Sequence, residues 1–229
     1  MGQDASLPVA SRQLPVHGFV LAGGRSTRMG QDKALLRVGG RTLVEIAVEK
    51  LRMFCAEVSI AGNRDDLSGY APVVREDRVD AGPGAGVEAG LKACKQPWAL
   101  FVPVDVPLVP AELLRRWALE AMRDPMSVSY LGASFPNAYW KQPAFCLLEQ
   151  ERQKTFSKLL DEGERGLEEL LNRTAWADHQ ASFMYDEYEL YPKDQRPDEA
   201  IQERWFTNVN TPEDLARVDA ILNREGQSV

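Results

Sequence analysis

Residues 16–24 read VHGFVLAGG, a short apolar run that ends in two glycines. Apolar and β-branched residues closed by a glycine turn predict a buried strand that ends near Ala22. The class of fold follows from this segment, because strand and helix patterns alternate from here to about residue 123. Such alternation predicts an α/β protein with a single Rossmann-like, mostly parallel sheet and helices on both of its faces.

The alternation is clearest where apolar residues recur at steps of three and four. Leu43, Ala47, Leu51 and Phe54 predict an amphipathic helix, and Thr42 is a suitable cap for its start. The same reading predicts strands at 57–61, 73–74 and 98–102, and helices at 82–94 and 110–122.

The second half of the chain is less regular. Strands are predicted at 127–131 and 141–148, and helical structure at 150–172 with a break at Gly163. Seven acids, three bases and two prolines lie within residues 183–204, which we interpret as a solvated loop or insertion. A cap residue, a proline and two acids at Thr211-Pro212-Glu213-Asp214 predict the start of a last helix that runs to about residue 225.

Composition excludes several classes of protein. The chain has 229 residues, 44% of them hydrophobic, and a formal net charge of −7. No apolar run approaches the roughly 20 residues of a membrane-spanning helix, and residues 1–15 lack the apolar core of a secretory signal. The acidic balance argues against a protein that coats nucleic acid. Three widely spaced cysteines predict no zinc site and favour a reducing, cytoplasmic location.

The segment after the first strand reads LAGGRSTRMGQDK over residues 21–33. It matches neither the P-loop pattern nor G-x-G-x-x-G. Gly23 and Gly24 nevertheless let the backbone approach a ligand with its N–H groups, and Arg25, Arg28 and Lys33 add three cations. We interpret the segment as a triphosphate-binding loop; a surface turn with solvated charges is the alternative.

Two acids also follow predicted strands, as the glycine pair does. Asp77 comes after the strand at 73–74, and Asp105 after the strand at 98–102. Ligands bind outside the carboxyl ends of parallel strands. The glycine pair and the two acids, which all follow such strands, should therefore meet at one edge of the sheet. Asp105 would suit Mg²⁺ held together with phosphates, whereas either acid could simply shape a turn.

Phosphate chemistry needs little else. A phosphate monoester that attacks a nucleoside triphosphate is already an anion near pH 7, so no general base is required. The reaction needs charge neutralisation and in-line positioning, which a carboxylate on Mg²⁺, a lysine, an arginine and backbone N–H groups supply. The two histidines, His17 and His179, lie away from every motif, which fits such a transfer.

Six motifs in order resemble those of the molybdenum cofactor guanylyltransferases, the MobA type of nucleotidyltransferase. The first is the segment at residues 21–33, similar to the family's L-A-G-G-x-S-x-R-M-G-x-D-K. The other five are Arg75-Glu76-Asp77, Gly82-Pro83-Gly84-Ala85-Gly86, Val104-Asp105-Val106-Pro107, Gln142-Pro143-Ala144 and Asn208-Val209-Asn210-Thr211-Pro212-Glu213-Asp214. The resemblance spans roughly residues 16–223 and implies a fold like that of the nucleotide-diphospho-sugar transferases.

The resemblance also implies roles for individual residues. Those implied to hold GTP are Leu21, Ala22, Gly23, Gly24, Lys33, Asn63, Asp77 and Asp105. Arg28, Lys33 and Asp105 would be catalytic, and Asp105 would bind Mg²⁺. Asn208 and Asn210 would lie near the acceptor, although they could only shape the turn before the last helix. The chain departs from the family at Ala61, where N-A-N-R is usual, and at Gly84, where G-P-L-A-G is usual, a change expected to alter the packing of the base.

The implied reaction is the transfer of GMP from Mg-GTP to a molybdopterin-type cofactor, with release of pyrophosphate. A disordered arm at 1–15 would precede one domain at 16–229, with a nucleotide-binding half at 16–123 and an acceptor-binding half at 124–229. Transient contact with proteins that mature molybdoenzymes is expected, but no nucleic acid or membrane. The alternatives are a molybdenum cofactor cytidylyltransferase, another small-phosphate nucleotidyltransferase, and a non-catalytic GTP sensor or scaffold.

Overall fold

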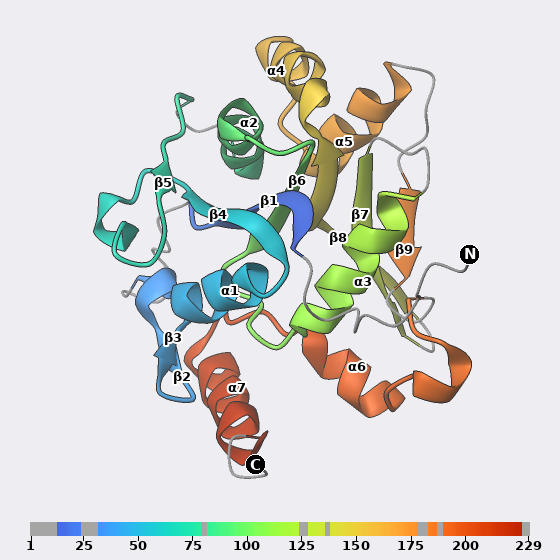
Figure 1. The fold of residues 1–229 in the computed structure, drawn as a ribbon. Helices are drawn as coiled ribbons and strands as arrows, with labels where there is room; N and C mark the ends of the chain where they lie inside the picture. Colours follow the sequence, from blue (N-terminus) through green and yellow to red (C-terminus); the bar gives the residue numbers. More distant parts are fainter. Residues whose placement is uncertain are drawn as a thin grey trace, which may run out of the picture.

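A seven-stranded sheet runs through the centre of the molecule (Figure 1), with strand order β5-β4-β1-β6-β8-β7-β9. The structure is a computed structural model, and it describes residues 13–23, 32–78, 82–123, 128–135, 138–177, 183–186 and 190–225. The strands are β1 (Leu14–Leu21), β4 (Cys55–Ala61), β5 (Val73–Val74), β6 (Trp98–Pro103), β7 (Val128–Phe135), β8 (Ala138–Glu149) and β9 (Phe183–Asp186). A separate pair joins β2 (Arg37–Val38) to β3 (Arg41–Thr42).

Within the large sheet, β5, β4, β1 and β6 pair in parallel, as does β9 with β7. Only β8 runs against its neighbours β6 and β7. The prediction of a mostly parallel sheet is therefore confirmed.

Helices cover both faces of this sheet, as predicted. They are α1 (Leu43–Arg52), α2 (Pro83–Ala93), α3 (Ala111–Ala121), α4 (Gln153–Asp161), α5 (Leu167–Trp176), α6 (Glu199–Trp205) and α7 (Pro212–Glu225). Buried residues of α2, α4 and α5 form one apolar cluster, and those of α1, α3, α6 and α7 belong to the other. Figure 1 shows α2, α4 and α5 together above the sheet. Among the described residues, no helix is both long and apolar enough to cross a bilayer.

Local sequence signals set several helix ends. The hydroxyl of Thr42 accepts from the backbone N–H of Glu45 at 3.3 Å, and the Glu45 carboxylate accepts from the Thr42 N–H at 3.2 Å. This reciprocal capping confirms Thr42 as the start of α1. Gly163, with φ +95°, ends the turn after α4, where the sequence predicts a break.

The interpretation of residues 183–204 as a solvated loop is wrong in part, although residues 192–195 within it are exposed. Part of this segment forms β9, which pairs with β7, and another part forms α6. Leu190, Tyr191 and Trp205 are buried and belong to the core cluster that includes residues of α3. The high content of acids in this segment concealed these few buried apolar residues. The first strand also begins at Leu14, before the predicted Val16.

Candidate active site

The carboxyl ends of four parallel strands meet at one edge of the sheet. Backbone hydrogen bonds continue the pairing past the strands: the N–H of Ala22 donates to the Ala61 carbonyl at 3.0 Å, and that of Val104 donates to the Leu21 carbonyl at 3.2 Å. The segments that follow β1, β4 and β6 are therefore held side by side. Leu21, Ala22 and Gly23 lie on the central segment, as predicted.

Lys33 and Asp105 meet at this edge although they are 72 positions apart. The Lys33 ammonium donates to Asp105 Oδ2 at 2.9 Å. It also donates to Oδ1 of Asn210, on the segment before α7. The side chains of Lys33 and Asp105 are 20% and 23% exposed, so the pair remains open to a ligand. The structure thus brings together two residues predicted for phosphate and metal.

Lys33 is placed by a short turn that its neighbour caps. The carboxylate of Asp32 accepts from the Ala34 N–H at 3.0 Å, at the start of the 3₁₀ turn Lys33–Leu35. Arg64 contacts both oxygens of Asp32 and also Asp66, which joins this turn to the segment after β4. The hydrogen bond to Asp66 raises the pKa of Arg64 more than those to Asp32 do, and the guanidinium therefore stays charged.

Asp105 and Asn210 are fixed to each other through the backbone. The N–H of Val209 donates to the Asp105 carbonyl at 2.9 Å. The carboxylate of Asp214, in the first turn of α7, accepts from the N–H groups of Asn210 and Thr211 at 3.2 and 3.1 Å. The motif at 208–214 therefore does more than begin a helix, because it presents the Asn210 amide oxygen to Lys33.

Gly23 lies where two segments of the backbone approach each other closely. A Cβ on Gly62, whose φ is +151°, would stand 3.1 Å from the Gly23 nitrogen. Gly62 follows Ala61, where the sequence departs from the family, and its lack of a side chain permits this approach. Gly24, Arg25 and Arg28, the remaining predicted residues of this loop, lie outside the described residues.

Asp77 and Asn63 make contacts other than with the Lys33–Asp105 pair. Asp77 is 76% exposed, and its carboxylate accepts from Lys92 on α2 at 3.4 Å. The Asn63 amide instead clamps the backbone of Glu76, accepting from its N–H at 3.1 Å and donating to its carbonyl at 3.3 Å. Their binding of GTP stays a prediction, with a position beside β5 rather than beside Lys33.

Glu76 is the residue at this edge that sequence reasoning missed. Its carboxylate is half-buried, and Oε1 stands 2.5 Å from where a Cβ on Gly23 would lie and 3.2 Å from one on Gly86. Burial raises the pKa of Glu76. The available signal was its place two residues after a strand end and one residue before Asp77.

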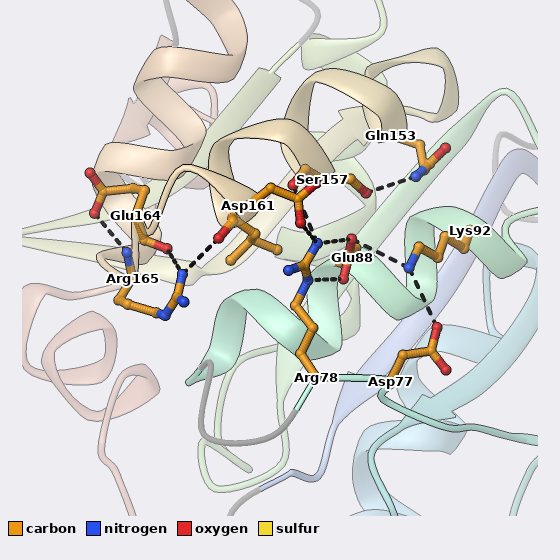
Figure 2. A network of polar contacts seen from close by, with 10 residues as sticks. Asp77, Arg78, Glu88, Lys92, Gln153, Ser157, Asp161, Glu164 and Arg165 are labelled. Carbon is orange, nitrogen blue, oxygen red and sulfur yellow. Dashed lines mark hydrogen bonds and ion pairs between the residues drawn. The ribbon is translucent and has the colours of Figure 1, made fainter.

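A network of ion pairs fixes the segment after β5 to the helices above it. Figure 2 shows Arg78 between Glu88 of α2 and Asp161 of α4. Its guanidinium donates to both Glu88 oxygens at 2.7 and 3.0 Å and to Asp161 at 2.7 Å. Lys92 lies 3.3 Å from Glu88 and also reaches Asp77. Burial alone would raise the pKa of Glu88, but hydrogen bonds from Arg78 and Ser157 outweigh it and lower the pKa to about 2.

Gly84 belongs to this helix packing. A Cβ there would stand 2.8 Å from Leu170 of α5 and 3.3 Å from Leu160 of α4. The glycine that replaces the family's leucine therefore faces the α4–α5 pair, where a larger side chain would displace Leu170.

The residues around Asp105 suit a hard divalent cation. A partly exposed carboxylate and the amide oxygen of Asn210 are both oxygen donors, the kind that Mg²⁺ prefers. Mg²⁺ in nucleotide sites commonly uses one or two carboxylates and completes its shell with phosphates and water. The donor set thus fits the predicted ion.

Comparison with known proteins identifies the family. A family model described as "MobA-like NTP transferase domain" matches residues 18–180, from β1 past α5. This chain belongs to that family. It is therefore a nucleotidyltransferase, as the six motifs predict.

Two curated relatives extend the match beyond the family model. A protein of Polynucleobacter asymbioticus named molybdenum cofactor guanylyltransferase is 33% identical over 216 residues, which cover 90% of this nucleotidyltransferase and 97% of the relative. One of the same name from Vibrio atlanticus is 30% identical over 203 residues, covering 86% and 92%. Both alignments span most of the two chains compared.

A solved structure confirms the fold. The molybdopterin-guanine dinucleotide biosynthesis protein A of Archaeoglobus fulgidus superposes with a TM-score of 0.70 at 20% identity, over 91% of this nucleotidyltransferase and 99% of that chain. At that identity the likeness shows the architecture alone. The prediction of a nucleotide-diphospho-sugar-transferase-like fold agrees with it.

Proposed function

We propose that this nucleotidyltransferase transfers GMP from Mg-GTP to the terminal phosphate of a molybdopterin-type cofactor and releases pyrophosphate. The names of the relatives support the guanylyl donor and the cofactor as acceptor. The observation that carries the proposal is the meeting of Lys33, Asp105 and Asn210 at the carboxyl edge of the sheet. A cation, a carboxylate and an amide oxygen at that edge are what a triphosphate and its metal require.

Each residue has a separate task in this reaction. Asp105 would hold Mg²⁺, which supplies charge neutralisation on the phosphates when bound. Lys33 would turn from Asp105 and donate to a phosphate oxygen, because its ammonium is already held within reach of that edge. Gly23 would let its backbone approach the nucleotide. Arg28 would add a second positive charge along the loop.

The chain needs no general base for this transfer. The attacking phosphate monoester carries its own negative charge near pH 7. His17 is buried, bonded to Ser59 at 3.0 Å and stacked on Phe19, so it serves packing. The work of the protein is to hold two anionic substrates in line and to offset their repulsion.

The test is a panel of nucleotides with Mg²⁺ and molybdenum-loaded cofactor. GTP should give the guanine dinucleotide and pyrophosphate, whereas turnover of CTP instead would indicate the cytidylyltransferase alternative. Asp105→Ala should lower turnover by orders of magnitude while the protein keeps its fold. Asp194→Ala, on the exposed turn Lys193–Gln195, is the matched control and should retain activity. Full activity in Asp105→Ala would refute the proposed role.

A further inference from the structure

A cavity of about 420 Å³ opens between α1, α6, α7 and the segment that joins β6 to α3. Figure 1 shows α6 and α7 beneath α1. Most of the wall is apolar, and the charged residues among the described ones that line it are all basic, namely Arg41, Lys50 and Arg204. The chain as a whole has the opposite balance, with a formal net charge of −7. The volume lies within the range of about 300–1,000 Å³ that is typical of sites for small organic molecules.

The apolar part of the wall continues from the core to the surface. Ile46 of α1 and Trp205 of α6 are 2% and 7% exposed, whereas Ile201 of α6 is 45% exposed. Leu222 of α7 is also partly exposed. Apolar surface that remains in water around a concave cavity marks a site of interaction. An apolar group bound here would be removed from water against Trp205 and Ile201, which favours its binding.

The three cations differ in the contacts that they already make. Arg41 pairs with Glu49 at 2.6 Å, and both side chains are about half exposed. The Lys50 ammonium donates to the Pro107 carbonyl. The Arg204 side chain is exposed and makes no hydrogen bond or ion pair with any residue that the structure describes. Its planar guanidinium matches carboxylates, sulfonates and phosphates, so Arg204 is the group that would bind an anion.

The cavity is separate from the predicted nucleotide site. The residues that meet at the edge of the sheet, Lys33, Asp105 and Asn210, do not line it. The α7 helix begins shortly after Asn210, and Leu222 lies about 15 Å further along its axis, at about 1.5 Å per residue. The two places share one short segment, since Pro107 follows Asp105 by two residues. Occupancy of the cavity therefore does not require the nucleotide.

We infer that this cavity is a second ligand site, which binds a small organic anion with an aromatic or branched aliphatic body. The body would pack on Trp205 and Ile201, and the anionic group would accept hydrogen bonds from Arg204. The apolar and basic groups converge on one cavity, which favours a small molecule over a protein partner, because a stable protein interface buries about 800 Å² on each side. The inference goes beyond the proposed function and does not depend on it.

Calorimetric titration with three naphthalene derivatives tests the inference. The probes are the anion naphthalene-1-sulfonate, the neutral 1-naphthalenemethanol and the cation 1-naphthylmethylammonium, which share one apolar body and differ in charge. The sulfonate should bind wild-type protein at one site with a Kd of about 1 mM or below, as expected for a ligand of this size. The neutral probe should bind about tenfold more weakly, because it forms no charge-assisted hydrogen bond, and the cation more weakly still. Equal affinity for the three probes, or no binding of the sulfonate up to about 10 mM, would overturn the inference.

Variants locate the bound sulfonate. Ile201→Asp places a carboxylate in the exposed apolar wall and should abolish binding, and Arg204→Glu should weaken it by about tenfold or more. Both positions are exposed, and urea unfolding checks that the two variants remain folded. Arg123→Glu makes the same change of charge at another exposed arginine and should leave the affinity unchanged, as should Lys33→Ala at the nucleotide site. Binding that survives Ile201→Asp and Arg204→Glu, or that is lost in Lys33→Ala, would show that the probe binds elsewhere and would refute the assignment.

Discussion

Arg78 is expected to be the most important single charge for the stability of this fold. It neutralises Glu88, whose side chain is 2% exposed, and it joins the segment after β5 to α2 and α4. Replacing Arg78 by methionine keeps much of the apolar stem but leaves a buried carboxylate whose remaining described polar neighbours are Lys92 and Ser157. Breaking a buried pair from one side is far more damaging than losing a surface pair.

The pKa of Glu88 sets the size of the effect. A fall from the ordinary 4.5 to about 2 corresponds to about 3 kcal/mol of stability, at about 1.4 kcal/mol per unit of pKa. The folded-state pKa lies below the unfolded one, so this stability is present above about pH 4.5 and is lost as pH falls toward 2. In Arg78→Met, burial of Glu88 is offset by Ser157 and Lys92 but no longer by Arg78, so its pKa should rise. The variant should then be about 3 kcal/mol less stable at pH 7.

Urea unfolding at several pH values measures the loss of stability and its dependence on pH. The stability difference between wild-type protein and Arg78→Met should be largest at pH 7 and should narrow toward pH 4, where Glu88 of the variant becomes protonated. Arg123→Met breaks the exposed Arg123–Glu120 pair and should cost less than about 0.5 kcal/mol at any pH. A difference for Arg78→Met below 1 kcal/mol, or one that stays constant from pH 7 to 4, would refute the reasoning.

Two glycines of the same region give further predictions. In Gly90→Ala, the added methyl group would stand 2.9 Å from Phe101 Cζ and 3.2 Å from Phe19, so thermal unfolding should show a loss of about 1–3 kcal/mol. In Gly62→Ala, strain at φ +151° and contact with the Gly23 backbone should weaken GTP binding several-fold in calorimetry. An unchanged affinity would mean that the Gly23 backbone does not contact the nucleotide.

The strands and their ends could be predicted because those signals are local. The apolar run before Gly23 and the polar residue that closes each strand need no tertiary information. Parallel pairing then places Asp105 near the end of β1, whatever the details of the loops. Lys33 was predicted from the cations and glycines beside it, and the structure puts it 2.9 Å from Asp105.

Other features depend on contacts between distant segments. Nothing in the sequence near Asn210 shows that its amide faces Lys33, 177 positions away. Residues 183–204 were misread in part because the many acids of the segment outweigh its few buried apolar residues, such as Leu190 and Tyr191. The average composition of such a segment does not show the few apolar residues that are buried.

Glu76 shows why the sequence alone does not tell which of two adjacent acids turns inward. Asp77 and Glu76 both follow β5, and alternation along an extended chain sends their side chains to opposite sides. Asp77 turns outward to Lys92, whereas Glu76 turns inward over Gly23. Because Arg78 is tied to Glu88 and Asn63 holds Glu76, the three-residue segment cannot rotate without breaking both attachments. Because the ion-pair network that joins α2 to α4 also fixes which carboxylate lies over Gly23, loss of Arg78 should shift the position of Glu76 as well as lower stability.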